Sequence, residues 1–364
     1  MAGPDALIAR ARDRHAAGDL AQARSLYEAA LRLVPRQPDA LTLLASLAYQ
    51  EGDEARGARL ADAAIDAYRQ MLLGAPNNHP LRAALANLLL ARERGGEAVA
   101  VIARALLGIY PVRAEAADHD ARRRRARARG LPGIVINALP KSASESIWNK
   151  LAEGLALAQG HISIGLFPDC LVVPYRARDL ARGGLAAKEH LAATAANLQA
   201  LDRAGIKRIV IHLREPRQAT LSWAHFLEGD VRKRLLAPLW RKTTPPAGFF
   251  AKPFGAQLDW HINHYLPLAM TFIDDWVTAA EAGAIEVAFL DFETFRTDAD
   301  GYFDRLLAFY EIDPAGFARD AKAETIHLRK GAIDEWRSVF TPAQRTRAWE
   351  KIPDALADRF GWRP

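Results

Sequence analysis

The chain has 364 residues and a mass of 40.0 kDa, which exceeds the roughly 100–200 residues of one domain, so we expect two domains. Half of the residues are hydrophobic and a quarter are charged, a balance that excludes a largely disordered chain. The net charge of +6 and the pI near 9.5 favour an anionic partner, without choosing among a nucleotide, a nucleic acid and an acidic lipid.

Cysteine content and the N-terminal sequence bear on the cell compartment. The single cysteine, Cys170, cannot form an internal disulfide, and residues 1–10 lack the basic-then-apolar layout of a secretion signal. No uninterrupted apolar run approaches the roughly 18 residues that a membrane-spanning helix needs. We therefore expect a protein of the reducing cytoplasm without a transmembrane segment.

The first predicted elements, in residues 5–110, are consecutive amphipathic helices rich in Ala, Leu and Arg. The stretches 18–23 and 52–57 repeat at a period of 34 residues, and a looser third copy around 96–98 is displaced by an insertion. Helix pairs with this period resemble tetratricopeptide repeats. We predict an N-terminal all-α helical-repeat domain over residues 1–115.

The role of the repeats is open between two interpretations. Such repeats offer a concave face to a peptide or protein, or they form a helical extension that packs only against its neighbour. The arginine-rich stretch that follows, residues 116–130, is typical of a solvated basic helix end or linker. It lacks the interleaved aromatic residues of a nucleic-acid-binding segment, so no nucleic-acid partner is expected.

The pattern changes to α/β at residue 131. The run 134–139 is short and rich in β-branched residues, as in a strand buried on both faces. It leads into the loop 140–148 (PKSASESIW) and a helical pattern, an arrangement that presents N–H groups, hydroxyls and a lysine to a phosphate. The glycine spacing of a Walker A loop is missing, which argues against a nucleotide kinase. A later run, 285–293, predicts another buried strand with an acidic turn, in which Glu293 is structural.

Three further segments carry anion-binding chemistry. A buried strand, 206–213, runs into Arg214, and Ser222 follows on a helix, so both side chains can bind one phosphate. The segment 328–341 contains Arg-Lys-Gly ahead of a Trp and a Phe-Thr. The stretch 188–191 (KEHL) places a histidine two residues after a lysine.

In this order, the four segments resemble the sulfotransferases that use 3′-phosphoadenylyl sulfate (PAPS). The loop 140–148 resembles their 5′-phosphosulfate loop and 214–222 their 3′-phosphate motif, while 328–341 and 188–191 resemble the C-terminal and catalytic-base segments. The resemblance implies a three-layer α/β sandwich with a central parallel sheet, the P-loop-like sulfotransferase fold, over 131–364. The nucleotide is then expected at the carboxyl ends of the strands.

The resemblance also implies roles for single residues. His190 is the implied general base for the acceptor, Lys188 lies near the sulfonate, and Lys141 stabilises charge on the leaving phosphate oxygen. Glu145, where the family has a hydroxyl residue, is the alternative base. The residues implied to bind the nucleotide are Lys141, Ser142, Ala143, Ser144, Glu145, Ser146, Arg214, Ser222, Arg329, Lys330 and Gly331.

We therefore predict a transferase that moves the sulfuryl group from PAPS, its co-substrate, to a hydroxyl or amine of an acceptor. A large acceptor, a glycan or a peptide, is expected because of the repeat domain, which is also a candidate site for a protein partner. No metal is predicted, because cationic side chains are expected to neutralise the anionic groups, as a magnesium ion does in a kinase. The alternative is a catalytically inactive, repeat-based interaction protein that retains the nucleotide fold. Ala143 and Glu145, where the family commonly has glycine and a hydroxyl residue, favour that alternative. The adenine-stacking residue is open, with Trp148 and Phe289 as candidates.

Overall fold

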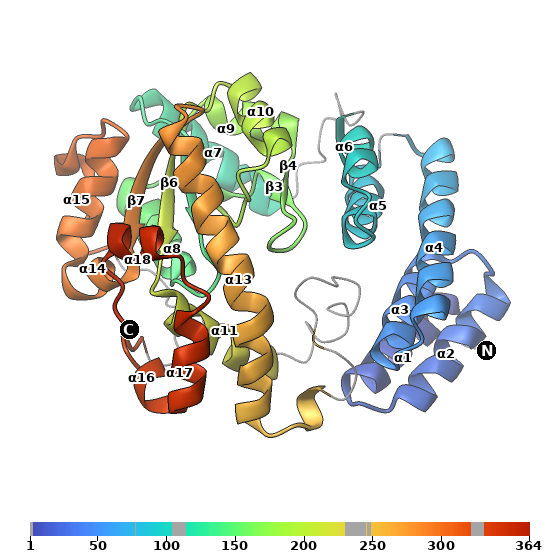
Figure 1. Cartoon of the computed structure of the whole chain (residues 1–364). Helices are drawn as coiled ribbons and strands as arrows, with labels where there is room; N and C mark the ends of the chain where they lie inside the picture. The colour runs from blue at the N-terminus through green and yellow to red at the C-terminus, as the bar shows by residue number, and fades with distance from the viewer. Residues whose placement is uncertain (1–2, 77, 104–113, 230–244, 246–248, 322–330) are drawn as a thin grey trace. The chain divides into compact units, whose positions relative to one another are not determined.

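The computed structural model describes residues 3–76, 78–103, 114–229, 245, 249–321 and 331–364. The chain forms two compact units (Figure 1). One consists of Met1–Gly108 with Ala224–Trp260, and the other of Ile109–Trp223 with His261–Pro364. Within the described ranges, none of the helices combines the length and the hydrophobicity that a bilayer span requires.

The first unit contains three successive helix pairs, and the two helices of each pair pack on one another. The pairs are α1 (Pro4–Ala16) with α2 (Leu20–Leu33), α3 (Pro38–Gln50) with α4 (Glu54–Gly74), and α5 (His79–Ala91) with α6 (Gly95–Ala103).

Glycine and aspartate mark the turn inside each of the first two pairs. Gly18 and Gly52 have φ of 81° and 83°, and the residues that follow them, Asp19 and Asp53, cap the next helix with their side chains. In the third pair Glu93 takes the left-handed position, with φ of 59°. Helix α4 has 21 residues and α2 has 14, so the insertion that displaces the third copy corresponds to about two helical turns of α4.

A five-stranded parallel sheet forms the centre of the second unit, as the sequence predicts. Its strand order is β2-β5-β1-β6-β7. The strands are β1 (Ile134–Ala138), β2 (Ala158–Gly160), β5 (Leu185–Glu189), β6 (Arg208–Leu213) and β7 (Glu286–Asp291). A separate antiparallel pair consists of β3 (Ser163–Ile164) and β4 (Leu171–Val172).

Helices follow the strands along the chain. In the described part of the chain from residue 114 onwards, the helices are α7 (Ala114–Ala128), α8 (Ser144–Leu155), α9 (Pro174–Ala181), α10 (Ala195–Ala204), α11 (Pro216–Gly229), α13 (Phe254–Glu281), α14 (Phe292–Thr297), α15 (Ala299–Phe309), α16 (Trp336–Val339), α17 (Pro342–Trp349) and α18 (Asp354–Phe360), with short 3₁₀ turns at Phe249–Ala251 and Pro314–Gly316.

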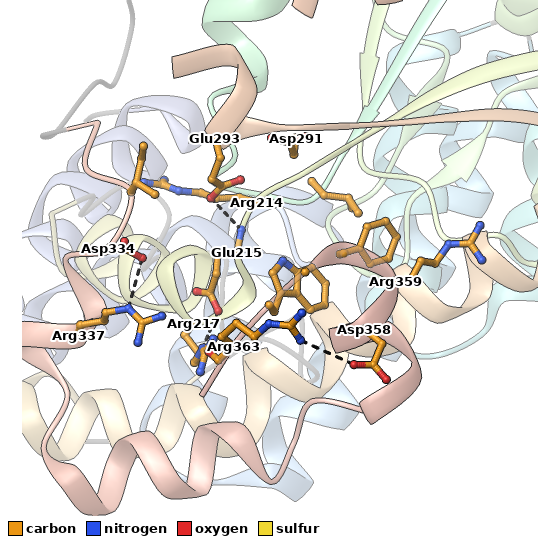
Figure 2. A pocket seen from close by; sticks show the side chains of 15 residues that line it. Arg214, Glu215, Arg217, Asp291, Glu293, Asp334, Arg337, Asp358, Arg359 and Arg363 are labelled. Atoms are coloured by element: carbon orange, nitrogen blue, oxygen red, sulfur yellow. Dashed lines mark hydrogen bonds and ion pairs between the residues drawn. The ribbon is translucent and has the colours of Figure 1, made fainter. Parts of the chain in front are cut away.

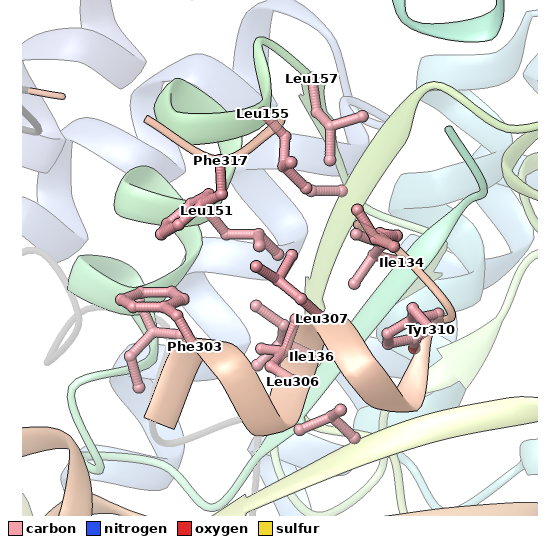
Figure 3. Close-up of a cluster of buried hydrophobic side chains, with 14 of the residues drawn as sticks. Ile134, Ile136, Leu151, Leu155, Leu157, Phe303, Leu306, Leu307, Tyr310 and Phe317 are labelled. Atoms are coloured by element: carbon pink, nitrogen blue, oxygen red, sulfur yellow. The ribbon is translucent and has the colours of Figure 1, made fainter. Parts of the chain in front are cut away.

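One face of the sheet packs against α8 and α15. Ile134 and Ile136 are two residues apart on β1, so their side chains point to the same face. There they join Leu151 of α8 and Leu306 of α15 in one buried cluster, with Phe317 beside them (Figure 3). This cluster is an apolar core beneath the strand that carries the predicted phosphate loop.

On the other face of β1, polar contacts join the strand to the segment after β5. Asn137 exchanges hydrogen bonds with the backbone of Leu191, at 2.9 Å to its carbonyl and 2.6 Å from its N–H. Trp276 of α13 donates to the same carbonyl at 2.7 Å. Helices therefore contact the sheet region from both sides, which is compatible with a three-layer sandwich.

The arginine run of residues 116–130 lies in and just after α7, and most of its side chains make contacts within the second unit. Arg122 and Arg129 donate to carbonyls in the last turn of α8, at 2.9 and 3.0 Å. Arg123 and Arg127 donate to carbonyls at the C-terminal end of α9. A run expected to be solvated or to link two domains therefore bonds carbonyls at the C-terminal ends of two helices, where the helix dipole favours a cation.

Candidate active site at the carboxyl edge of the sheet

The carboxyl ends of the parallel strands meet at one edge, which is where open α/β sheets bind ligands. The chain passes from β1 to β2 and β5 on one side of β1, and then crosses to β6 and β7 on the other side. Strand β1 therefore lies where the strand order reverses. The loop 139–143, which contains the predicted phosphate-binding residues, leaves the sheet at this topological switch point.

The backbone of the loop 139–143 is strained. Lys141 and Ala143 have φ of 70° and 67°, the left-handed region that costs a residue with a Cβ roughly 1 kcal/mol or more. Ser142 is buried, and its hydroxyl donates to a carbonyl within the loop at 2.6 Å. The Ser142 hydroxyl is therefore already used as a donor, and the donor that Ser142 can offer to an anion is its backbone N–H.

Helix α8 begins immediately after this loop, and its N-cap residue, Ala143, makes no side-chain cap. The N–H groups of its first turn have no intrahelical carbonyl to bond, and the helix dipole adds partial positive charge there. The predicted ligands in this turn are Ser144, Glu145 and Ser146. This end of the helix is suited to a phosphate or sulfonate group.

The strain at Ala143 yields a stability prediction. Ala143→Gly is expected to raise the free energy of unfolding by about 1 kcal/mol, because glycine adopts left-handed φ without a Cβ penalty. Urea unfolding measures the change. Ala156→Gly is a matched control, since Ala156 is left-handed at the other end of α8, with φ of 52°, and should gain a similar amount. A loss of stability at 143 beside a gain at 156 would contradict the loop geometry.

Arg214, at the end of β6, joins two of the predicted segments. Its guanidinium donates to the carbonyl of Lys141 at 2.8 Å and to that of Ala332 at 2.6 Å. It also lies over the Phe292 ring, 4.0 Å from the centroid. The side chain that the resemblance assigns to a phosphate therefore also ties the loop after β1 to the C-terminal segment.

The other residues predicted for the 3′-phosphate are described in part. Ser222 is half-buried on α11. Gly331, next to Ala332, is left-handed with φ of 62°, a conformation that glycine adopts readily. Arg329 and Lys330 lie outside the described residues.

His190 follows β5 and lies beside the end of β1, because the register pairs Glu189 with Asn137. Its Nδ1–H donates to the carbonyl of Ala138 at 2.7 Å, so the neutral ring has its lone pair on Nε2. Burial lowers the pKa of His190 to about 4, and the bond to Ala138 opposes that change only in part. At pH 7 the imidazole is neutral, and Nε2 is able to accept a proton.

Lys188 and Glu145, both predicted site residues, form an ion pair. The Lys188 Nζ lies 2.5 Å from a Glu145 carboxylate oxygen and 5.6 Å from the centroid of the Trp148 ring. Trp148 is buried in the core cluster and donates its Nε1–H to Ala186 O at 2.8 Å. Glu145, whose carboxylate is predicted to lie beside the phosphosulfate, is thus neutralised by Lys188, the lysine expected near the sulfonate.

A cavity of about 600 Å³ opens beside Arg214 at the ends of β6 and β7 (Figure 2). Its volume is in the range of small-molecule sites, roughly 300–1,000 Å³. Its other walls come from the segment around Asp334 and from residues 358–363. Arginines and carboxylates line it in equal number, so the cavity offers both hydrogen-bond donors and acceptors. They are Arg214, Arg217, Arg337, Arg359, Arg363, Glu215, Asp291, Glu293, Asp334 and Asp358.

A buried ion pair forms part of the cavity wall. The Arg217 Nε donates to Glu215 at 2.5 Å, and its guanidinium lies 3.8 Å from the Trp336 ring centroid. Burial raises the pKa of Glu215, and the Arg217 guanidinium opposes that rise. Glu293, predicted to be structural, accepts the Glu215 N–H at 3.3 Å, and burial raises the pKa of Glu293 as well. Neither member of the pair was predicted from the sequence.

The described ranges contain no group of three or more His, Cys, Asp or Glu side chains arranged as a metal site. No protein-family model, curated protein or solved structure matches this chain.

Proposed function

We propose that this protein is a sulfotransferase that moves the sulfuryl group of PAPS to a hydroxyl or amine of an acceptor. One observation carries the proposal: side chains from distant parts of the sequence bond to the backbone at one edge of the sheet. Arg214 bonds both the loop at Lys141 and the C-terminal segment at Ala332. His190 bonds the last residue of β1. The proposal includes the P-loop-like sulfotransferase fold and a tetratricopeptide-like N-terminal unit.

The donor set at this edge suits a nucleotide with anionic groups at both ends. Lys141 and the uncapped first turn of α8 would bind the 5′-phosphosulfate. The cavity beside Arg214 would accept the nucleoside, with Arg329, Lys330 and Gly331 assigned to the 3′-phosphate by resemblance. PAPS supplies an activated sulfuryl group when bound.

Two residues of the chain have roles in the proposed transfer. As the acceptor oxygen bonds to sulfur, its proton passes to His190 Nε2. As the bond between sulfur and the phosphate oxygen breaks, Lys141 stabilises the charge on that oxygen. The products are the sulfated acceptor and 3′,5′-adenosine diphosphate, and the proton leaves His190 to solvent. Glu145 remains the second candidate base, although it would have to release Lys188.

The acceptor we propose is a glycan or a peptide, and the helix pairs of the first unit are the proposed docking surface for it or for a protein partner. We propose a cytoplasmic location, since the chain has a single cysteine. Nucleic acid is not a proposed partner, because four arginines of the basic run bond helix-end carbonyls.

A second candidate function is that of a repeat-based interaction protein that retains the nucleotide fold without activity. The ion pair between Lys188 and Glu145 favours it, because the pair engages the lysine expected near the sulfonate. This candidate predicts that the protein transfers no sulfuryl group to any acceptor.

Isothermal titration with 3′,5′-adenosine diphosphate tests the proposal. The wild type is expected to bind, and Lys141→Ala is expected to weaken binding by about 10- to 100-fold, the effect of losing a hydrogen bond to a charged group. Lys207→Ala is the matched control. Lys207 is an exposed lysine beside the amino end of β6, paired with Asp202, and its loss should leave the affinity unchanged.

The proposal fails if the folded wild type does not bind the diphosphate. Tight binding of ATP with magnesium instead would favour a kinase on a related fold. Binding of the diphosphate, together with no transfer from labelled PAPS to any glycan or peptide, would favour the inactive alternative.

A further inference from the structure

Four consecutive carbonyls of the loop after β1, those of residues 139 to 142, are each held by a different side chain. The distances from donor to carbonyl oxygen are 2.6, 3.0, 2.8 and 2.6 Å. The donors, in chain order of the carbonyls, are the hydroxyl of Ser142, the hydroxyl of Tyr265, the guanidinium of Arg214 and the Nε2–H of His212.

These four bonds fix the direction of the loop's N–H groups. In a planar trans peptide, the C=O of one residue and the N–H of the next point in opposite directions. With the carbonyls of 139–142 held by these donors, the N–H groups of 141–143 point away from them. They directly precede the first turn of α8, where the N-cap residue Ala143 makes no side-chain cap, and successive backbone N–H groups in such a turn are suited to an anion.

Two of the four donors, Tyr265 and His212, are not among the predicted site residues. Tyr265 lies on α13, is 1% exposed and stacks on Trp223, with 4.9 Å between ring centroids. His212 lies within β6, is fully buried, and accepts at Nδ1 from the Tyr302 hydroxyl at 3.0 Å. Burial raises the pKa of Tyr265 and lowers the pKa of His212 to about 4. Both side chains are neutral at pH 7, and each is held in one orientation.

We propose that Tyr265 and His212 are positioning residues for the anion site. They hold the loop carbonyls so that its N–H groups are preorganised for the 5′-phosphate, without touching the nucleotide themselves. The inference rests on the proposed function for the identity of the nucleotide. Preorganised dipoles lower the free-energy cost of binding, because the loop needs little rearrangement to bind the anion.

Tyr265→Phe removes only the hydroxyl and keeps the stacked ring. We expect its affinity for 3′,5′-adenosine diphosphate and for inorganic pyrophosphate to fall by about three- to tenfold, the value of one hydrogen bond. Its affinity for adenosine 3′-monophosphate, which lacks the 5′-phosphate, should stay within about twofold of the wild type. A general loss of structure would weaken all three ligands alike.

Tyr310→Phe is a matched control. The Tyr310 hydroxyl is buried and bonds the backbone of the same strand, at Val135, with distances of 2.9 and 3.0 Å. Val135 lies near the amino end of β1, away from the loop, so this variant should bind all three ligands as the wild type does. Tyr302→Phe is a second test variant that acts through His212, and it should weaken the same two ligands.

Each outcome decides between the inference and the proposed function. Equal losses for the diphosphate and the 3′-monophosphate, or equal losses in Tyr265→Phe and Tyr310→Phe, overturn the positioning role. Wild-type binding of the diphosphate with an unchanged Tyr265→Phe overturns it too, and leaves the function intact. If the wild type binds pyrophosphate but neither nucleotide, and Tyr265→Phe weakens pyrophosphate, the positioning role holds and the function fails. If none of the three binds, both fail.

Discussion

His190→Gln is expected to lower kcat for sulfuryl transfer by about 10²- to 10⁴-fold, the usual contribution of a general base. The affinity for 3′,5′-adenosine diphosphate should change by less than about twofold, since the base contacts the acceptor and not the nucleotide. The basis is the ring geometry. Nδ1–H is committed to Ala138 O at 2.7 Å, which leaves the lone pair on Nε2. The rate is measured as transfer from labelled PAPS to an acceptor identified in a screen of glycans and peptides. If the screen identifies no acceptor, the rate of PAPS hydrolysis is measured instead.

The pH dependence of the rate follows from the neutral ring. Burial lowers the pKa of His190 to about 4, and the neutral form is the one that accepts a proton. The contribution of His190 should therefore be constant between about pH 5.5 and 8, and fall as the pH falls through about 4. A half-maximal rate near pH 6.5 would contradict this, because it would indicate an unperturbed imidazole.

Glu145→Gln separates the two candidate bases. If His190 is the base, this variant should keep most of the rate, although it releases Lys188 from its ion pair. If Glu145→Gln loses the rate and His190→Gln keeps it, the base is Glu145. His161→Gln serves as a control for a neighbouring imidazole, because its Nδ1 bonds the backbone of Lys188 rather than the end of β1.

Arg217→Ala is expected to lower the free energy of unfolding by about 3–5 kcal/mol, the cost of breaking a buried ion pair by removing one partner. Arg217 is 1% exposed, pairs with Glu215 at 2.5 Å, and donates to the backbone of Arg363. Its guanidinium also packs over Trp336. Without it, Glu215 would be left as a buried carboxylate lacking its cation, and the C-terminal residues would lose a contact to α11. Urea unfolding gives the change in midpoint.

Two further variants show whether the loss comes from the pair. The double variant Arg217→Met with Glu215→Gln should recover most of the stability, because apolar or neutral groups of similar size can replace a buried pair at little cost. Arg182→Ala removes an arginine whose side chain is 74% exposed, and it should change stability by no more than about 0.5 kcal/mol. A loss at Arg217 as small as that at Arg182 would contradict the buried pair.

The strands that the sequence predicts correctly are those with β-branched residues and a clear polar end. The runs 134–139, 206–213 and 285–293 correspond to β1, β6 and β7. Strand β5, Leu185–Glu189, was not identified, because its sequence LAAKE has no β-branched residue and suits a helix equally well. Ala186 and Ala187 are fully buried in the sheet, so tertiary packing overrides a local preference there.

The candidate site also contains parts that can be located from the sequence and parts that cannot. The loop around Lys141, the strand end at Arg214 and the histidine after β5 could be located from local patterns, because each is a short segment with its own chemistry. The long-range hydrogen bonds of the site could not be predicted from local patterns. The Tyr265 hydroxyl meets a carbonyl 125 residues earlier in the chain, and His212 meets one 70 residues earlier. Neither pairing leaves a periodicity or spacing in a single sequence, and the same holds for the pair between Lys188 and Glu145.

The arginines of α7 affect where the chain can be cut for expression. A fragment beginning at residue 131 follows the apparent change in sequence pattern, but it would lack Arg122, Arg123, Arg127 and Arg129. The carbonyls at the ends of α8 and α9 would then lose these bonds, and both helix ends would lose the cations beside them. A fragment meant to keep the phosphate loop on an intact α8 should therefore include α7 from Ala114, even though that stretch looks like a linker.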